Sequence, residues 1–147
     1  MFPGWISLRV KDPKEVAQWY SQHLGLEVLG GRHIGGGETQ ALGSPKEKGP
    51  AMILLPGQPL DHPERLQMHF AVPDVDDVYE RMKQEGVRFD EPPADMPWGW
   101  RHAYTRDPAG HTVEICSRCP TQTSKNRPVA SHPACLAKQE SEARERT

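Results

Sequence analysis

Two stretches decide the fold: WISLRVKD at residues 5–12 and QMHFAVPD at residues 67–74. In both, apolar and polar side chains alternate, which is typical of a β-strand with one buried face. Both end in an aspartate, a residue type that caps the start of a helix. A strand followed by a capped helix, found twice in one chain, indicates a duplicated module.

A helical pattern follows each of these aspartates. After Asp12 comes Pro13, which suits the first helical position, and Gly25 supplies the stop. Asp74 opens the second helix and Gly86 closes it. The apolar stripes are Val16, Trp19, Tyr20 and Leu24 in the first helix and Val75, Val78, Tyr79 and Met82 in the second.

Each helix is followed by three extended segments. They span 26–33, 38–43 and 51–55 in the first half and 87–90, 100–106 and 111–116 in the second. The last two flank DPAG, whose Pro and Gly favour a tight turn. The sequence therefore predicts an α+β fold of two β-α-β-β-β modules, covering about residues 1–58 and 62–117.

Composition limits the chain to about one domain. It has 147 residues, of which 35% are apolar, below the roughly 45–50% of average globular proteins. Residues 118–147 contain no Phe, Tyr, Trp, Ile or Met. Because this segment can bury little apolar surface, we expect a domain at 1–117 and a flexible C-terminal tail at 118–147.

Several classes of protein are excluded. The longest apolar run is residues 51–55, far short of the ~20 residues that a membrane helix needs. The N-terminal sequence shows no signal peptide, and three cysteines, all at or after Cys116, give no disulfide framework for the core. With a net charge of −2, the chain has no positive electrostatic potential that would attract nucleic acid. We expect a cytoplasmic protein without nucleic-acid or membrane partners.

Three segments carry a family resemblance: LRVKDPKEVAQWYSQHLGLEVL, HFAVPDVDDVYERMKQEGVRF and PWGWRHAYTRDPAGHTVEI. With them the chain resembles the vicinal oxygen chelate superfamily, which includes glyoxalase I, bleomycin-resistance proteins, fosfomycin-resistance enzymes and extradiol dioxygenases. The resemblance implies that the two modules form a curled mixed sheet around an open cup that holds a small molecule. It also implies a homodimer.

The resemblance raises the question of a metal ion, since metal-dependent members place ligands at four equivalent strand positions. Here these are Trp5, which cannot ligate, the apolar residues 52–54, Gln67 and Glu114. His69 shares the strand face of Gln67 and can substitute. We therefore expect no metal cofactor; a divalent metal, if present, would use Gln67, His69 and Glu114. The other interpretations are a satisfied histidine at position 69 and a carboxylate that no longer binds a metal at 114.

Aromatic residues suggest the ligand. On the first strand Ile6, Leu8 and Val10 should face the helix, which leaves the alternate residues for the cup. PWGWRH at residues 97–102 adds two tryptophans, which suit planar ligands or else pack the loop. Which face of strand 100–106 lines the cup stays open. The predicted ligand-binding residues are Trp5, Ser7, Arg9, Gln67, His69, Trp98, Trp100, His102 and Glu114.

The cysteines permit a second site. Cys116, Cys119, His132 and Cys135 have the residue types of a structural zinc site, although the simpler interpretation is three free thiols.

Two functions compete. The favoured one is a bleomycin-resistance-like protein that sequesters or carries a planar or aromatic compound without metal. The alternative is an enzyme: a metal-dependent lyase, isomerase or dioxygenase using Gln67, His69 and Glu114, or one in which His69 and Glu114 form a catalytic acid–base pair.

Overall fold

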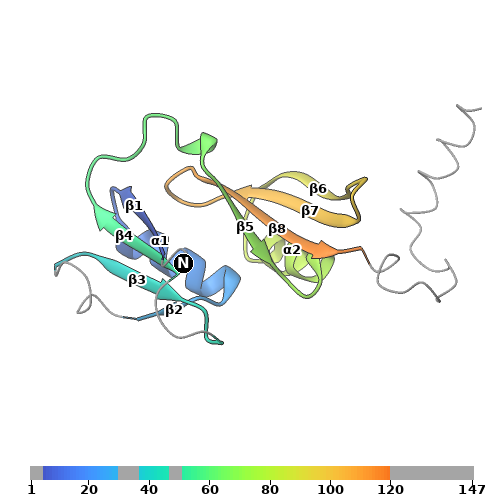
Figure 1. Cartoon of the computed structure of the whole chain (residues 1–147), viewed down its shortest axis with the longest axis horizontal. Coiled ribbons are helices and arrows are strands. Elements are labelled where there is room, and N and C mark those ends of the chain that lie inside the picture. The colour runs from blue at the N-terminus through green and yellow to red at the C-terminus, as the bar shows by residue number, and fades with distance from the viewer. Residues whose placement is uncertain (1–4, 30–36, 47–50, 120–147) are drawn as a thin grey trace, which may run out of the picture. The chain divides into compact units, whose positions relative to one another are not determined.

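The structure, a computed structural model, describes residues 5–29, 37–46 and 51–119. The first module consists of β1 (Ile6–Val10), α1 (Pro13–Leu24), β2 (Glu27–Val28), β3 (Gln40–Gly43) and β4 (Met52–Pro56). The second consists of β5 (Gln67–Ala71), α2 (Val75–Gln84), β6 (Phe89–Asp95), β7 (Trp100–Arg106) and β8 (Thr112–Arg118). A 3-10 turn, η1 (Pro63–Arg65), precedes β5 (Figure 1). The predicted α+β fold with two β-α-β-β-β modules is confirmed.

The helix boundaries follow from local chemistry. Asp12 accepts hydrogen bonds from the backbone N–H groups of Lys14 and Glu15 at 3.0 Å, and Gly25 ends α1 in the left-handed conformation with φ of 70°. Asp74 caps α2 in the same way, from Asp76 at 2.8 Å. Both predicted caps are therefore correct.

Each module contributes one four-stranded sheet. The strand orders are β1-β4-β3-β2 and β5-β8-β7-β6. In the first sheet β1 runs parallel to β4, with Ile6 opposite Met52, while β3 is antiparallel to both β4 and β2. The core of this module is buried between the sheet and α1 and includes Leu8, Val10, Val16, Ala17, Tyr20, Leu42, Met52 and Leu54.

The predicted two-residue alternation holds on both first strands. On β1, Leu8 and Val10 are buried, whereas Trp5, Ser7 and Arg9 are exposed. Ile6, at the start of the strand, is partly exposed. On β5, Met68 is buried, and the exposed residues are Gln67, His69 and Ala71.

Two strand lengths differ from the prediction. β6 continues to Asp95 through Pro92 and Pro93, whereas the sequence predicted an end at residue 90. β6 lies at the edge of its sheet, where a proline costs no ladder hydrogen bond on the open side. β2 has only two residues of the predicted segment 26–33: Leu26 and Leu29 lie outside the strand, and 30–33 lie outside the described residues.

The last strand runs past the predicted end of the domain at 117. β8 continues to Arg118, and Cys119 is buried. Of the predicted tail at 118–147, residues 120–147, which include His132 and Cys135, lie outside the described residues. No helix in the described part of the chain is long and apolar enough to cross a membrane.

Contacts divide the chain into two compact units that do not coincide with the two modules. The first unit takes residues 1–68 and also Thr105–Val113, the turn between β7 and β8. The second takes His69–Tyr104 and continues from Glu114. The first unit thus completes its core with a turn from the second module.

Candidate functional site

A row of three polar side chains crosses the sheet of the second unit. Glu114 lies on β8, between β5, which carries His69, and β7, which carries His102. Its Oε1 atom is 3.0 Å from Nδ1 of His69 and 2.9 Å from Nδ1 of His102. We call these residues the His69–Glu114–His102 row. The carboxylate is almost completely buried at 2% exposure, whereas the His69 side chain is 58% exposed.

The contact of His102 with Glu114 shows which face of β7 belongs to this row of side chains. His102 turns toward Glu114, and by the alternation of the strand Trp100 and Tyr104 share its face. The Tyr104 hydroxyl lies 3.3 Å from Nδ1 of His102. Arg101, on the opposite face, reaches α2 instead. The polar row and the helix therefore lie on opposite faces of the sheet.

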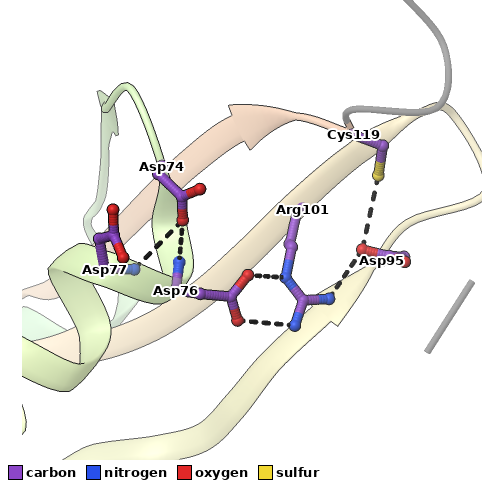
Figure 2. A network of polar contacts seen from close by, with 6 residues as sticks. All are labelled: Asp74, Asp76, Asp77, Asp95, Arg101 and Cys119. Carbon is purple, nitrogen blue, oxygen red and sulfur yellow. Dashed lines mark hydrogen bonds and ion pairs between the residues drawn. The ribbon is translucent and has the colours of Figure 1, made fainter. Parts of the chain in front are cut away.

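Arg101 anchors the helix side of β7. Its Nε and Nη2 atoms donate to both carboxylate oxygens of Asp76 at 2.7 and 2.9 Å, and Nη1 donates to Asp95 at 2.8 Å. Figure 2 shows this guanidinium between the two acids, with the Cys119 thiol next to Asp95. These hydrogen bonds, chiefly those to Asp76, raise the pKa of Arg101 above its usual range. The pairing fixes β7, and with it the position of His102.

Aromatic side chains flank one end of the row. Trp98 is 63% exposed, and its ring meets the His102 ring edge-on, with centroids 5.9 Å apart. The His102 and Tyr104 rings are 6.2 Å apart. Trp100 is half-buried, and the guanidinium of Arg118 lies 5.7 Å from its ring centroid. Of these two tryptophans, Trp98 is the one whose surface is available to a ligand.

The charge of Glu114 extends to its neighbours. Burial, and then the negative charge of Glu114, raise the pKa of the Tyr104 hydroxyl. The same two causes raise the pKa of the Cys116 thiol, which lies on the same strand face. Both groups therefore stay neutral at physiological pH, and the site disfavours an additional negative charge.

The side chains do not fit the family's metal site. The Trp5 side chain has no lone pair that could bind a metal ion, and Met52, Ile53 and Leu54 are apolar and buried. Among the described residues, no group of three or more His, Cys, Asp or Glu side chains is arranged to hold a metal ion.

Four of the predicted site residues belong to the first unit. Trp5, Ser7 and Arg9 lie on the exposed face of β1 in the first unit, where Arg9 donates to the carbonyl of Pro56 at 3.5 Å. Gln67 is exposed at the start of β5. The ligand-binding roles of these four residues stay predictions.

The sequence missed the contact between His102 and Glu114, having paired Glu114 with His69 alone. It also omitted Tyr104 from the predicted site. The signal was present, because positions 100, 102, 104 and 106 share one strand face. What the sequence lacked was the pairing of β7 with β8.

The two described cysteines are both free thiols that point to different partners. The Cys116 thiol is 3.7 Å from the carbonyl oxygen of Phe70, and the Cys119 thiol is 3.5 Å from a carboxylate oxygen of Asp95. The predicted zinc site depends on His132 and Cys135 and so lies partly outside the described residues.

A cavity of about 480 Å³ in the first unit has none of the row residues in its wall. It is bounded by the start of α1, residues 58–63 and the turn at Pro108 and Ala109.

Comparisons with known proteins agree with this architecture. A family model described as Glyoxalase/Bleomycin resistance protein/Dioxygenase superfamily matches residues 3–115. The uncharacterized protein YetH of Bacillus subtilis (strain 168) is 24% identical over 98 residues, which cover 65% of this chain and 82% of that protein.

Solved structures show the same fold. The crystal structure of TioX from Micromonospora sp. ML1 matches with a TM-score of 0.63 and 25% identity, over 80% of this chain and 99% of that chain. A glyoxalase/bleomycin resistance protein/dioxygenase from Nocardioides matches with a TM-score of 0.64 and 20% identity, over 88% of this chain and 91% of that chain.

Proposed function

Because the chain belongs to the glyoxalase/bleomycin resistance protein/dioxygenase superfamily, we propose that it binds a planar aromatic small molecule next to the His69–Glu114–His102 row, without a metal ion. The observation that carries the proposal is the exposed Trp98 ring beside this partly buried polar row. Ligand sites commonly combine aromatic walls with a few converging polar groups, and these residues supply both.

The roles divide by chemistry. Trp98 supplies a flat apolar surface on which an aromatic ring can stack. His69, exposed at one end of the row, supplies a hydrogen-bonding atom that a ligand can reach. Glu114 is almost completely buried beside the two imidazoles, so it acts on a ligand chiefly through its negative charge.

Ligand binding is tested first on the natural compound. Mass spectrometry of small molecules that co-purify with the native protein should find an aromatic compound. Its affinity is then measured by tryptophan fluorescence for the wild type and for Trp98→Ala. Losing one stacked ring removes about 0.5–1.5 kcal/mol beyond area burial, so the variant should bind several-fold more weakly. Trp5→Ala and Trp100→Ala, measured alongside, test the two other predicted tryptophans. Unchanged affinity in all three variants would contradict the proposed site.

A separate experiment tests whether the protein binds a metal ion. Elemental analysis of protein purified without an affinity tag should find well under one Ni, Zn, Mn or Fe per chain, because three of the four family positions carry apolar, aromatic or amide side chains. About one metal ion per chain, lost on Glu114→Ala, would favour the metal-dependent enzyme instead. Loss on Cys119→Ala would point to the cysteine site.

A further inference from the structure

The cavity of the first unit has the size of a small-molecule site. Its volume is about 480 Å³, within the range of roughly 300–1,000 Å³ that such sites occupy, and all its wall residues belong to this one unit. One wall is the start of α1, where Asp12, Glu15 and Val16 follow helical spacing and so lie on one side. The other walls are residues 58–63 and the turn at Pro108 and Ala109.

The wall segment between β4 and β5 is fixed at both ends. At its start, the N–H group of Gly57 donates to the last carbonyl of β1 at 3.1 Å. At its end, the Thr112 hydroxyl donates to the carbonyl of Glu64 at 2.8 Å. Between them, Pro63 packs so closely against Gly110 that a Cβ atom at this glycine would lie 3.1 Å from Cγ of the proline. The cavity is therefore preformed, which lowers the cost of binding a ligand.

The apolar part of the wall contains no aromatic side chain. Its members are saturated: Val16, Pro59, Leu60, Pro63, Pro108 and Ala109. Leu60 is 52% exposed, so a compound that covers it removes apolar surface from water and gains free energy in proportion to that area. Without a ring for stacking, the wall suits a saturated, non-planar hydrocarbon body.

The polar part of the wall selects the charge of the ligand. Besides Gln58 it has three carboxylates, of Asp12, Glu15 and Asp61, and one ammonium group, of Lys11. Asp12 caps α1, whereas the Glu15, Asp61 and Lys11 side chains form no ion pair with a residue that the structure describes. The N-terminal end of α1 adds only about half a positive charge. The wall thus stays negative and favours a cation.

We propose that this cavity is a second binding site, for a compound with a saturated hydrocarbon body and a protonated amino group. The hydrocarbon body covers Leu60 and the prolines, and the ammonium group lies beside Glu15 and Asp61. The proposal does not depend on the proposed function, because it names another ligand class and another part of the chain.

Four probes separate charge from apolar contact. 2-Cyclohexylethylammonium has both features, 2-cyclohexylethanol is neutral, 3-cyclohexylpropanoate is an anion and ethylammonium lacks the ring. Each is titrated into the millimolar range against isotope-labelled full-length protein, and NMR follows the backbone amide shifts. We expect 2-cyclohexylethylammonium to bind about three- to tenfold more tightly than 2-cyclohexylethanol, since exposed charges add modestly to affinity, and to shift the amides of Glu15, Leu60 and Ala109. The anion and ethylammonium should bind more weakly than either.

Two variants test the two parts of the wall. Glu15→Gln combined with Asp61→Asn keeps the shape but removes both charges, so it should weaken 2-cyclohexylethylammonium about three- to tenfold and leave 2-cyclohexylethanol nearly unchanged. Leu60→Ser, at an exposed position, should weaken both probes. Glu27→Gln combined with Glu38→Gln makes the same change of net charge at exposed positions outside the cavity wall and should change neither.

The position of the shifts decides between this cavity and the His69–Glu114–His102 row. Trp98→Ala should bind 2-cyclohexylethylammonium like the wild type. Shifts confined to amides around Trp98 and His69, or no shifts with any probe, would overturn the second site and leave the proposed function standing, because its aromatic ligand is measured separately. Equal binding of 2-cyclohexylethylammonium and 3-cyclohexylpropanoate, or unchanged affinity in the double variant of Glu15 and Asp61, would overturn the cationic ligand.

Discussion

Asp107 is the most heavily used acceptor among the described side chains of the first unit. Its carboxylate accepts from the Tyr20 hydroxyl at 2.9 Å and lies 2.8 Å from Nδ1 of His111. It also accepts from the backbone N–H groups of Ala109 and His111, both at 2.9 Å, which closes the DPAG turn. Burial, and then the charge of Asp107, hold the pKa of Tyr20 far above its usual range, so its hydroxyl keeps its proton at physiological pH.

Removing the Tyr20 hydroxyl should therefore destabilise the protein. Tyr20→Phe keeps the buried ring but removes one hydrogen bond to a charged group, which contributes about 1.5–3 kcal/mol to the free energy of unfolding. Urea unfolding followed by circular dichroism measures the loss.

Tyr79→Phe is the matched control, because the Tyr79 hydroxyl makes no hydrogen bond to another described residue. Its ring contacts, to Phe89 and Lys83, survive the substitution. It should change the free energy of unfolding by no more than about 0.5 kcal/mol. An equal effect of both substitutions would show that the bond between Tyr20 and Asp107 adds nothing.

At the scale of elements, Arg101 joins three of them: β7, the start of α2 through Asp76 and the end of β6 through Asp95 (Figure 2). The guanidinium is nearly buried, and the Asp95 side chain is mostly buried as well. Asp76 is 40% exposed and can regain water if its partner is lost.

Arg101→Met should thus cost about 1–3 kcal/mol of the free energy of unfolding, the usual penalty for a buried polar group that loses its partner. Arg81→Met breaks an exposed ion pair, Arg81 with Glu85 at 3.4 Å, and should cost at most about 0.5 kcal/mol. Thermal or urea unfolding of both variants compares them, and similar losses would refute a structural role for the Arg101 pairs.

The elements that could be predicted from the sequence are those fixed by residues close together in the chain. The caps Asp12 and Asp74 were predicted correctly because a cap acts within three residues of the chain. The extension of β6 through Pro92 and Pro93 was not, because only its place at a sheet edge makes it possible. The site was predicted in part for the same reason: alternation placed His69 and Glu114 on usable faces, but the contact of His102 with Glu114 requires the pairing of β7 and β8.

At the scale of the whole molecule, Arg118 and Cys119 belong to the folded domain, although composition placed them in the tail. Cys119 is buried, its N–H donates to the carbonyl of Gly99 at 2.9 Å, and its thiol contacts Asp95. No apolar segment follows these contacts, since residues 120–147 contain one Leu and one Val.

A variant that ends at Cys119 should therefore melt within a few degrees of the full chain. A variant that ends at Ser117 loses the Cys119 contacts and should melt lower, by roughly 4 °C for each ~1 kcal/mol lost. Differential scanning calorimetry of the two variants measures the difference. A large drop for the variant ending at Cys119 would show that the tail packs on the domain.

The bond between Tyr20 and Asp107 has a consequence for biosynthesis. The two residues lie 87 positions apart, so the ribosome makes the donor long before its acceptor. At about 5–20 residues per second, roughly 4–17 s pass between them. During that time the helix that carries Tyr20 exists without the turn that completes its core. The nascent first module therefore lacks this hydrogen bond until the turn of the second module has been synthesised.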